Sequence, residues 1–119
     1  MTDVARLRKA LEYAHAHPEL HYQGEWAMKT ACGTTMCLAG TVAWQAGYRF
    51  IWMSDNSAAE VRGPDGDVES VESAAWRLLD LDSSYQANAL FYEAGNIENL
   101  YWAANEITDG EIEIPLELQ

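Results

Sequence analysis

Residues 30–47 read TACGTTMCLAGTVAWQAG, and we expect the rest of the chain to be built around this stretch. Its many small side chains let neighbouring backbones come close together. One helical face collects four residues at the right spacing: Cys37, Gly40, Thr41 and Trp44. Either Thr34 or Thr35 is expected to cap the helix, and Gly47 can end it in the left-handed conformation. The stretch therefore predicts the central helix of a small domain.

Apolar residues at helical spacing predict further helices on both sides of this stretch. The first is expected to run from a cap at Thr2 or Asp3 to about residue 17. After it, residues 18–33 form a long connection that carries its own packed side chains. Three later helices are expected at 67–79, at 83–94 and from 97 to about 108.

Strand periodicity is confined to three short stretches. Residues 48–53 are aromatic and β-branched, and 58–62 can return beside them after a turn. The tail, EIEIPLEL at 111–118, alternates apolar and acidic side chains, and Pro115 restricts it to a sheet edge. We expect the tail to complete the sheet, or else to pair with a second copy as a homodimer. The predicted fold class is mainly α, with about four helices and this small antiparallel β-element, or α+β if the tail strand pairs.

Length and composition fit one domain that spans residues 1–119. Hydrophobic residues make up 49% of the chain, which excludes the class of disordered proteins. No apolar run approaches the roughly 20 residues needed to span a bilayer, and the charged, amphipathic start is unlike a secretion signal. Two cysteines without an export signal predict reduced thiols in a cytoplasmic protein that does not contact a membrane.

The net charge of −12 is distributed unevenly along the sequence. Five acidic side chains balance five basic ones in residues 1–59, whereas residues 60–119 hold fourteen acidic side chains against only Arg62 and Arg77. A segment with this excess of negative charge repels the nucleic-acid backbone and attracts a basic protein surface. We therefore expect a partner with a basic surface and no direct binding of nucleic acid. The alternative is an acidic surface that only keeps the protein soluble.

Two stretches resemble a family of small uncharacterised proteins found in actinobacterial phages and their hosts. The first, CGTTMCLAG at 32–40, matches a CGTxxCxAG pattern preceded by a tryptophan, here Trp26. The second, at 78–91, is similar to the LLGL…QA…LF segment of that family, with Asp80 where a glycine is usual. The resemblance covers roughly residues 10–107. It implies a phage-encoded protein that acts in the host cytoplasm, and it implies no activity.

Cys32 and Cys37 are the candidates for nucleophilic or redox chemistry. A thiol at a helix N-terminus can have a lowered pKa, and His21 is a possible base for it. However, no residue can be picked out to orient His21, so the expected role of the motif is structural. Its members are Cys32, Gly33, Thr34, Cys37 and Gly40. Since the sequence has no second cysteine pair for a zinc site, neither a metal nor a cofactor is expected.

Two tryptophans of the acidic half, Trp76 and Trp102, lie off the main apolar stripes of their helices. Exposed tryptophans are frequent in protein-binding hot spots. The expected partner-binding residues are Trp76, Trp102, Asp80, Asp82, Glu111 and Glu113. The leading hypothesis is a non-enzymatic accessory protein that binds a host protein through its acidic C-terminal half. Two alternatives stay open: a nucleic-acid mimic that inhibits a DNA-binding protein, and a cysteine-dependent or redox enzyme that uses Cys32 or Cys37.

Overall fold

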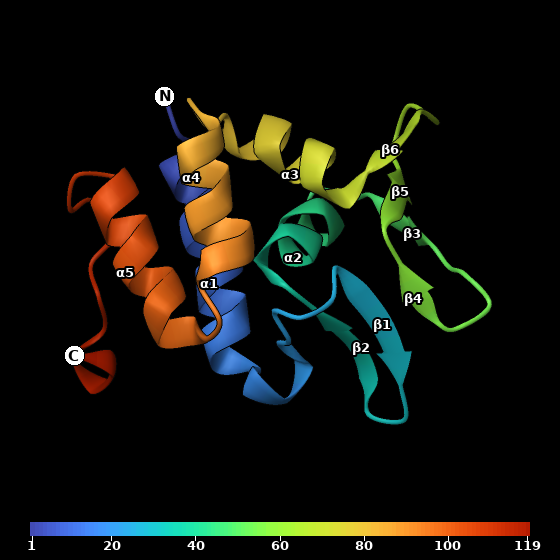
Figure 1. The fold of residues 1–119 in the computed structure, drawn as a ribbon, viewed down its shortest axis with the longest axis horizontal. Coiled ribbons are helices and arrows are strands. Elements are labelled where there is room, and N and C mark those ends of the chain that lie inside the picture. The colour runs from blue at the N-terminus through green and yellow to red at the C-terminus, as the bar shows by residue number, and fades with distance from the viewer.

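A computed structural model describes all 119 residues and shows an α+β fold with five α-helices and two three-stranded antiparallel sheets (Figure 1). The helices are α1 (Val4–Ala16), α2 (Leu38–Gln45), α3 (Val71–Leu79), α4 (Ser84–Asn88) and α5 (Ile97–Ile107). The strands are β1 (Ala27–Thr30), β2 (Gly33–Met36), β3 (Arg49–Ile51), β4 (Ser57–Ala58), β5 (Glu60–Arg62) and β6 (Val68–Ser70). Three short helical segments of other types are η1 (Pro18–Leu20), η2 (Ala89–Glu93) and η3 (Leu116–Leu118).

The prediction of a mainly α fold with one small β-element is wrong, because the predicted connection at 18–33 contains a strand. In this stretch β1 pairs with β2 on one side and with β4 on the other, giving the order β2-β1-β4. The hairpin turn between β1 and β2 is held by the Thr30 hydroxyl, which donates to the Gly33 carbonyl at 2.7 Å. This side chain also accepts the backbone N–H of Cys32 at 3.2 Å.

Helix α2 lies in the middle of the molecule (Figure 1), and six of its residues, from Leu38 to Ala43, are buried. The predicted central helix is therefore confirmed, but its predicted start at 34 or 35 is wrong. Residues 33–36 are bound to β1 as a strand, and Cys37 keeps an extended backbone. The N-cap is Cys37, whose sulfur accepts the Gly40 N–H at 3.5 Å. Gly47 ends the helix with a φ of 88°, as predicted.

The second sheet has the order β3-β5-β6. The predicted pairing of 48–53 with 58–62 is confirmed for 49–51 and 60–62, since β3 and β5 are antiparallel neighbours. Ala58, placed in the same predicted strand, instead belongs to β4 and pairs with β1 in the first sheet. The third strand is β6, which follows the turn at 63–66 and pairs with β5. Because β6 occupies Val68–Ser70, the next helix begins at Val71 rather than at 67, and the Ser70 hydroxyl caps it by accepting the Ser73 N–H at 3.0 Å.

The tail forms no strand, so the predicted strand at 111–118 is wrong. Both backbone groups of Ile112 are bound to side chains of α5 and its C-cap residue. Its N–H donates to the Thr108 hydroxyl at 3.1 Å, and its carbonyl accepts from the Asn105 amide at 2.9 Å. Neither group is free for a β-ladder, and the Ile112 side chain is buried against the core. A homodimer formed through this segment would therefore lack the edge strand that it was expected to use.

Several helix ends follow the sequence-based expectations. Asp3 caps α1, Ser83 caps α4 and Asn96 caps α5, each by accepting a backbone N–H three residues later. Asp80 takes the left-handed conformation, with a φ of 53°, at the end of α3. Glycine is favoured in this conformation, so Asp80 ends α3 with the backbone geometry that a glycine at this position would take.

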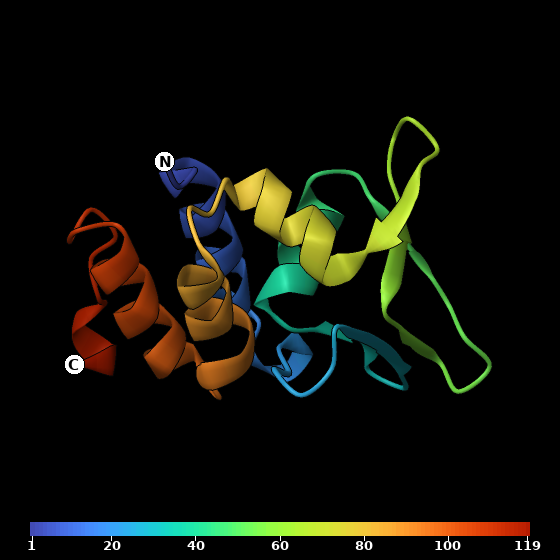
Figure 2. The same cartoon turned by 45° about the horizontal axis from the view of Figure 1, so that its top comes forward.

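The main core draws on all five helices, and a smaller cluster of Ala27, Met36 and Ala58 belongs to the first sheet. In both views α5 and the C-terminus lie at one end of the molecule and the second sheet at the other (Figures 1 and 2). The molecule measures 39 × 30 × 21 Å. None of its helices has both the length and the apolar character required to cross a bilayer.

Candidate functional site

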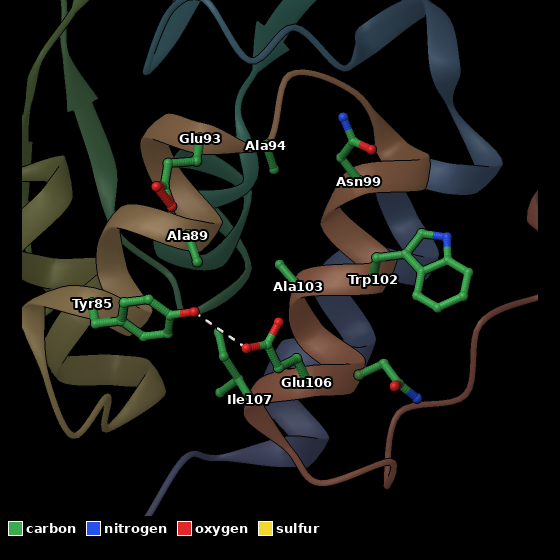
Figure 3. Close-up of a pocket in the computed structure, with 10 residues that line it drawn as sticks. Tyr85, Ala89, Glu93, Ala94, Asn99, Trp102, Ala103, Glu106 and Ile107 are labelled. Carbon is green, nitrogen blue, oxygen red and sulfur yellow. Dashed lines mark hydrogen bonds between the residues drawn. The ribbon is translucent and has the colours of Figure 1, made fainter.

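A groove of about 320 Å³ lies between α5 and the helix that α4 and η2 form together (Figure 3). Alanines on both sides, Ala89, Ala94 and Ala103, line it. Larger side chains at facing helix positions normally interdigitate and fill such a space. The groove therefore exists because two adjacent helices present methyl groups to each other.

The helix wall of this groove contains the π-helix η2, which has wider turns than an α-helix. Ala89 and Glu93 are its first and last residues, and both line the groove. The end of η2 is held by the side-chain amide of Gln23, which donates to the carbonyls of Leu90 (3.2 Å) and Ala94 (3.3 Å). Gln23 thereby fixes the position of the wall from which Glu93 projects.

The groove is acidic. Glu93 and Glu106 line it, and no basic side chain does. The hydroxyl of Tyr85 donates to Glu106 at 3.2 Å (Figure 3), and this hydrogen bond to a carboxylate raises the pKa of Tyr85. The phenol therefore keeps its proton at neutral pH and holds the carboxylate at the rim of the groove.

A second groove, of about 690 Å³, lies between α5 and the tail. Trp102 and Asn105 line both grooves, and Glu113 and Leu116 line the second. The indole of Trp102 is 51% exposed and Leu116 is 83% exposed. Trp102 thus forms the wall between two adjoining grooves, and its ring is turned away from Tyr85 (Figure 3).

These side chains form one continuous exposed area. We call it the Trp102 surface, and it comprises Tyr85, Glu93, Trp102, Glu106, Glu113 and Leu116. It combines a large aromatic side chain, an exposed leucine and three carboxylates. Aromatic side chains of this kind carry much of the binding energy in protein interfaces, and carboxylates select a basic partner.

The structure brings together only some of the residues expected to bind a partner. Trp102 and Glu113 belong to the Trp102 surface. Glu111 is exposed beside it, and its backbone carbonyl accepts from the Arg8 guanidinium at 3.0 Å.

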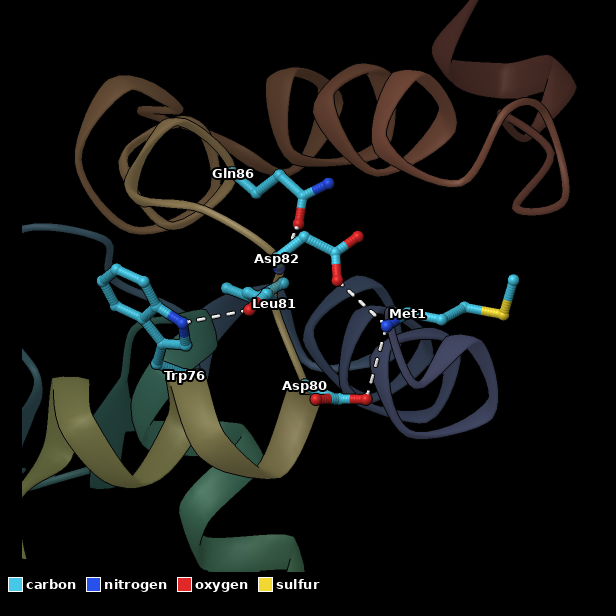
Figure 4. A network of polar contacts seen from close by, with 6 residues as sticks. All are labelled: Met1, Trp76, Asp80, Leu81, Asp82 and Gln86. Atoms are coloured by element: carbon cyan, nitrogen blue, oxygen red, sulfur yellow. Dashed lines mark hydrogen bonds and ion pairs between the residues drawn. The ribbon is translucent and has the colours of Figure 1, made fainter.

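Trp76, Asp80 and Asp82 line neither groove. Trp76 is half-buried, and its indole N–H donates to the Leu81 carbonyl at 3.1 Å (Figure 4). The Asp80 and Asp82 carboxylates lie 3.5 and 2.9 Å from the amino group of Met1, whose pKa they raise. The two aspartates thus join the N-terminus to the α3–α4 connection, and Trp76 bonds within that connection.

The acidic half of the sequence is split in space. Glu60, Asp65 and Asp67 lie on or beside the second sheet, whereas Glu106 and Glu113 lie on α5 and the tail, at the other end of the molecule (Figures 1 and 2). Strand β5 also carries Arg62, and β3 carries Arg49. The charge asymmetry of the sequence is therefore not the asymmetry of the surface, and only carboxylates supply charge to the two grooves beside Trp102.

The cysteine motif runs from an exposed turn to the buried start of α2. Cys32 is exposed in the β1–β2 turn, Gly33 and Thr34 lie in β2, and Cys37 is buried at the start of α2. Burial raises the pKa of the Cys37 thiol to about 11, so this thiol is protonated at neutral pH. The Cys37 sulfur contacts the Trp26 carbonyl at 3.8 Å and the Gly40 N–H at 3.5 Å.

His21 does not hydrogen-bond to either sulfur. Its Nε2 atom bonds the side-chain oxygen of Gln23 at 3.0 Å, and burial lowers the pKa of the imidazole. The same Gln23 oxygen accepts the Leu38 N–H at 2.7 Å. His21 and Gln23 together therefore support the first turn of α2. No three His, Cys, Asp or Glu side chains are grouped in a way that could hold a metal ion.

Comparisons with protein-family models, with curated proteins and with solved structures return no match for this chain. The resemblance to the phage family, noted from residues 32–40 and 78–91, therefore stays a prediction. Sequence reasoning also missed Tyr85, Glu93 and Glu106 as site residues. One local signal was present, since Tyr85 lies off the apolar stripe of Ala87, Leu90 and Phe91.

Proposed function

We propose that this protein is a non-enzymatic accessory protein that binds a partner protein through the Trp102 surface. The observation that carries the proposal is an indole, 51% exposed, between two grooves whose charged side chains are all carboxylates. The exposed Trp102 and Leu116 side chains adjoin the same groove, and contiguous exposed apolar surface rimmed by polar residues marks sites of interaction.

The partner segment is basic. An arginine or lysine side chain that enters the first groove can pair with Glu93 or Glu106, and its stem can pack on the three alanines. At an exposed site, a cation over the face of a tryptophan contributes about 0.5–1 kcal/mol, and more when water is excluded. A segment that extends past Trp102 reaches Glu113 and Leu116 in the second groove.

The resemblance to phage proteins gives this partner a proposed identity, a protein of the bacterial host, met in the host cytoplasm. The protonated Cys37 thiol argues against an enzyme that uses Cys37, because the thiolate is the nucleophile in cysteine-dependent enzymes. The division of the carboxylates between two ends of the molecule disfavours a nucleic-acid mimic, which needs a continuous array of negative charge.

Two variants with the same chemical change test this proposal. Trp102→Ala removes the exposed indole of the Trp102 surface, and Trp44→Ala removes an indole that is 45% exposed elsewhere. Both proteins are immobilised and used to capture proteins from an actinobacterial lysate at low salt. We expect a protein that the native chain and Trp44→Ala retain and that Trp102→Ala loses. Its release at high salt would show the ionic part of the contact. Identical capture by both variants would contradict the proposal.

A further inference from the structure

A third groove, of about 490 Å³, lies between α1, β2, α2 and β3, away from α5. Its lining is aromatic. Tyr13 and Trp44 have ring centroids 5.1 Å apart, and Phe50 and Trp52 have centroids 5.4 Å apart. With 45% of its surface exposed, Trp44 presents a ring to solvent at the mouth of this groove. Four aromatic side chains therefore contribute to the lining of this groove.

Two positively charged side chains lie beside these rings. Arg49 lines the groove, and the Lys29 ammonium lies 4.8 Å from the centroid of the Trp52 ring. Lys29 is the cross-strand partner of Thr34, a lining residue, so both side chains leave the hairpin on the same face. The lining includes no carboxylate.

These cations have no anionic partner within the chain. Neither the Lys29 ammonium nor the Arg49 guanidinium forms an ion pair or a side-chain hydrogen bond, although the protein carries nineteen acidic residues. By contrast, Arg6 and Arg77 each pair with a carboxylate. The groove thus combines stacked aromatic side chains with two unpaired positive charges in a chain whose net charge is −12.

We propose that this groove binds a nucleotide, with the base against Trp44 and Trp52 and the phosphates on Arg49 and Lys29. Stacking on aromatic side chains suits any nucleobase because every base has a π-face. A guanidinium is suited to phosphate because its N–H groups form a planar fork. A pocket of 490 Å³ also lies within the range typical of small-molecule sites.

A mononucleotide fits the charge of the protein better than a longer strand does. Two cations can offset the phosphates of one nucleotide, whereas each further phosphate of an oligonucleotide meets a molecule with a net charge of −12. The proposed ligand is therefore a free nucleotide. This site shares no residue with the Trp102 surface, so it goes beyond the proposed function and stands or fails independently.

The probe is ADP, titrated into the full-length protein by isothermal calorimetry at low salt. Adenosine, which lacks the phosphates, and pyrophosphate, which lacks the base, are the two matched ligands. We expect saturable binding of ADP at one site, with each half-ligand weaker by about tenfold or more, since charge-assisted hydrogen bonds and stacking both contribute. Failure of ADP to bind at millimolar concentration would overturn the proposal.

Paired variants assign the site. Arg49→Gln is expected to weaken ADP binding by about tenfold, whereas Arg8→Gln, on α1 beside the tail and outside the groove, changes the same net charge and leaves binding within about twofold. Trp44→Ala weakens ADP binding, and Trp102→Ala does not. Equal effects of Arg49→Gln and Arg8→Gln would refute a specific phosphate contact. A hexamer of single-stranded DNA or an acidic hexapeptide that bound more tightly than ADP would overturn the assignment to a free nucleotide.

Discussion

Gly40 of α2 faces the backbone carbonyl of Trp26, and a Cβ atom at Gly40 would lie 2.1 Å from that oxygen. The carbonyl belongs to the residue before β1, so this contact sets the distance between α2 and the first sheet. A side-chain rotation cannot relieve this clash, because the Trp26 oxygen belongs to the backbone and the Cβ atom would be fixed to the Cα atom of Gly40 in the helix. The glycine of the CGTTMCLAG motif is therefore required by packing.

Gly40→Ala is expected to lower the free energy of unfolding by about 2–4 kcal/mol, as overpacking a rigid site does. Urea denaturation followed by tryptophan fluorescence measures this change. Gly95→Ala is the control, since a Cβ atom there meets nothing within 4 Å. A loss of stability that is the same in both variants would contradict the close contact.

Gln23→Ala is expected to destabilise the fold by about 2–3 kcal/mol, because it leaves the Leu38 N–H and two carbonyls of the η2 end without partners. Hydrogen exchange gives the sharper test. The Leu38 amide should lose protection in Gln23→Ala and keep it in Gln23→Glu, which retains an acceptor oxygen. Unchanged protection of Leu38 in the alanine variant would show that this bond is unimportant.

Cys37 should make the stability of the protein depend on alkaline pH. Burial raises the pKa of its thiol from 9.0 to about 11. The thiol is protonated in both states below about pH 9, whereas between 9 and 11 it ionises only in the unfolded chain. Stability is therefore lost as pH rises through this window, by about 2–3 kcal/mol.

Urea titrations from pH 8 to pH 11 check this dependence. Cys37 also contributes to the raised pKa of Tyr92, so all proteins are compared in a Tyr92→Phe background, where the difference from Cys37→Ala isolates the buried thiol. We expect the native protein and Cys32→Ala to lose stability more steeply than Cys37→Ala. Parallel pH profiles for all three proteins would argue against a buried, protonated Cys37.

The two thiols should also differ in reactivity. Cys32 is exposed in its turn, and Cys37 is 1% exposed. Iodoacetamide at pH 8 is expected to add one label to the folded protein and two labels in urea, as measured by intact mass. Labelling of both cysteines in the folded state would restore the possibility of chemistry at Cys37.

Ile112→Ala is expected to cost about 2–4 kcal/mol of stability, because the side chain is buried in the core. Leu116→Ala, in the same tail and 83% exposed, should stay within about 0.5 kcal/mol of the native protein. Similar losses in the two variants would contradict the docked position of the tail.

The helix caps could be predicted from the sequence because each one is a local event. Asp3, Ser83 and Asn96 bind the N–H of a residue only three positions later, so no distant contact decides them. The tail shows the opposite case. Its alternation is that of a strand, but Asn105 of α5 and the C-cap residue Thr108 bind both backbone groups of Ile112 and prevent a ladder. That contact depends on the docked position of the tail, which the alternation does not encode.

The prediction of the sheets and the prediction of the site were incomplete for the same reason, which is that both depend on contacts between segments far apart in the sequence. Strand β1 has four residues and no clear alternation, and it is defined by pairing with β2 and with the distant β4. Trp102 was identified because it lies off the stripe of its own helix. The acidic groove beside it was missed, because it arises where Ala89 and Ala103 of two different helices face each other. The periodicity of one helix does not show which residues of another helix it will pack against.

A π-helical turn holds one residue more than an α-helical turn, so η2 has the form of a helix that has accepted an insertion. Deleting one residue within Ala89–Glu93 would let the helix close into regular geometry. Everything after the deletion would then rotate by about 100° around the axis. Glu93 would leave the groove, and the Ala94 carbonyl would lose Gln23. A shortened homologue would in this way keep Leu90 near the core while losing one carboxylate of its binding face.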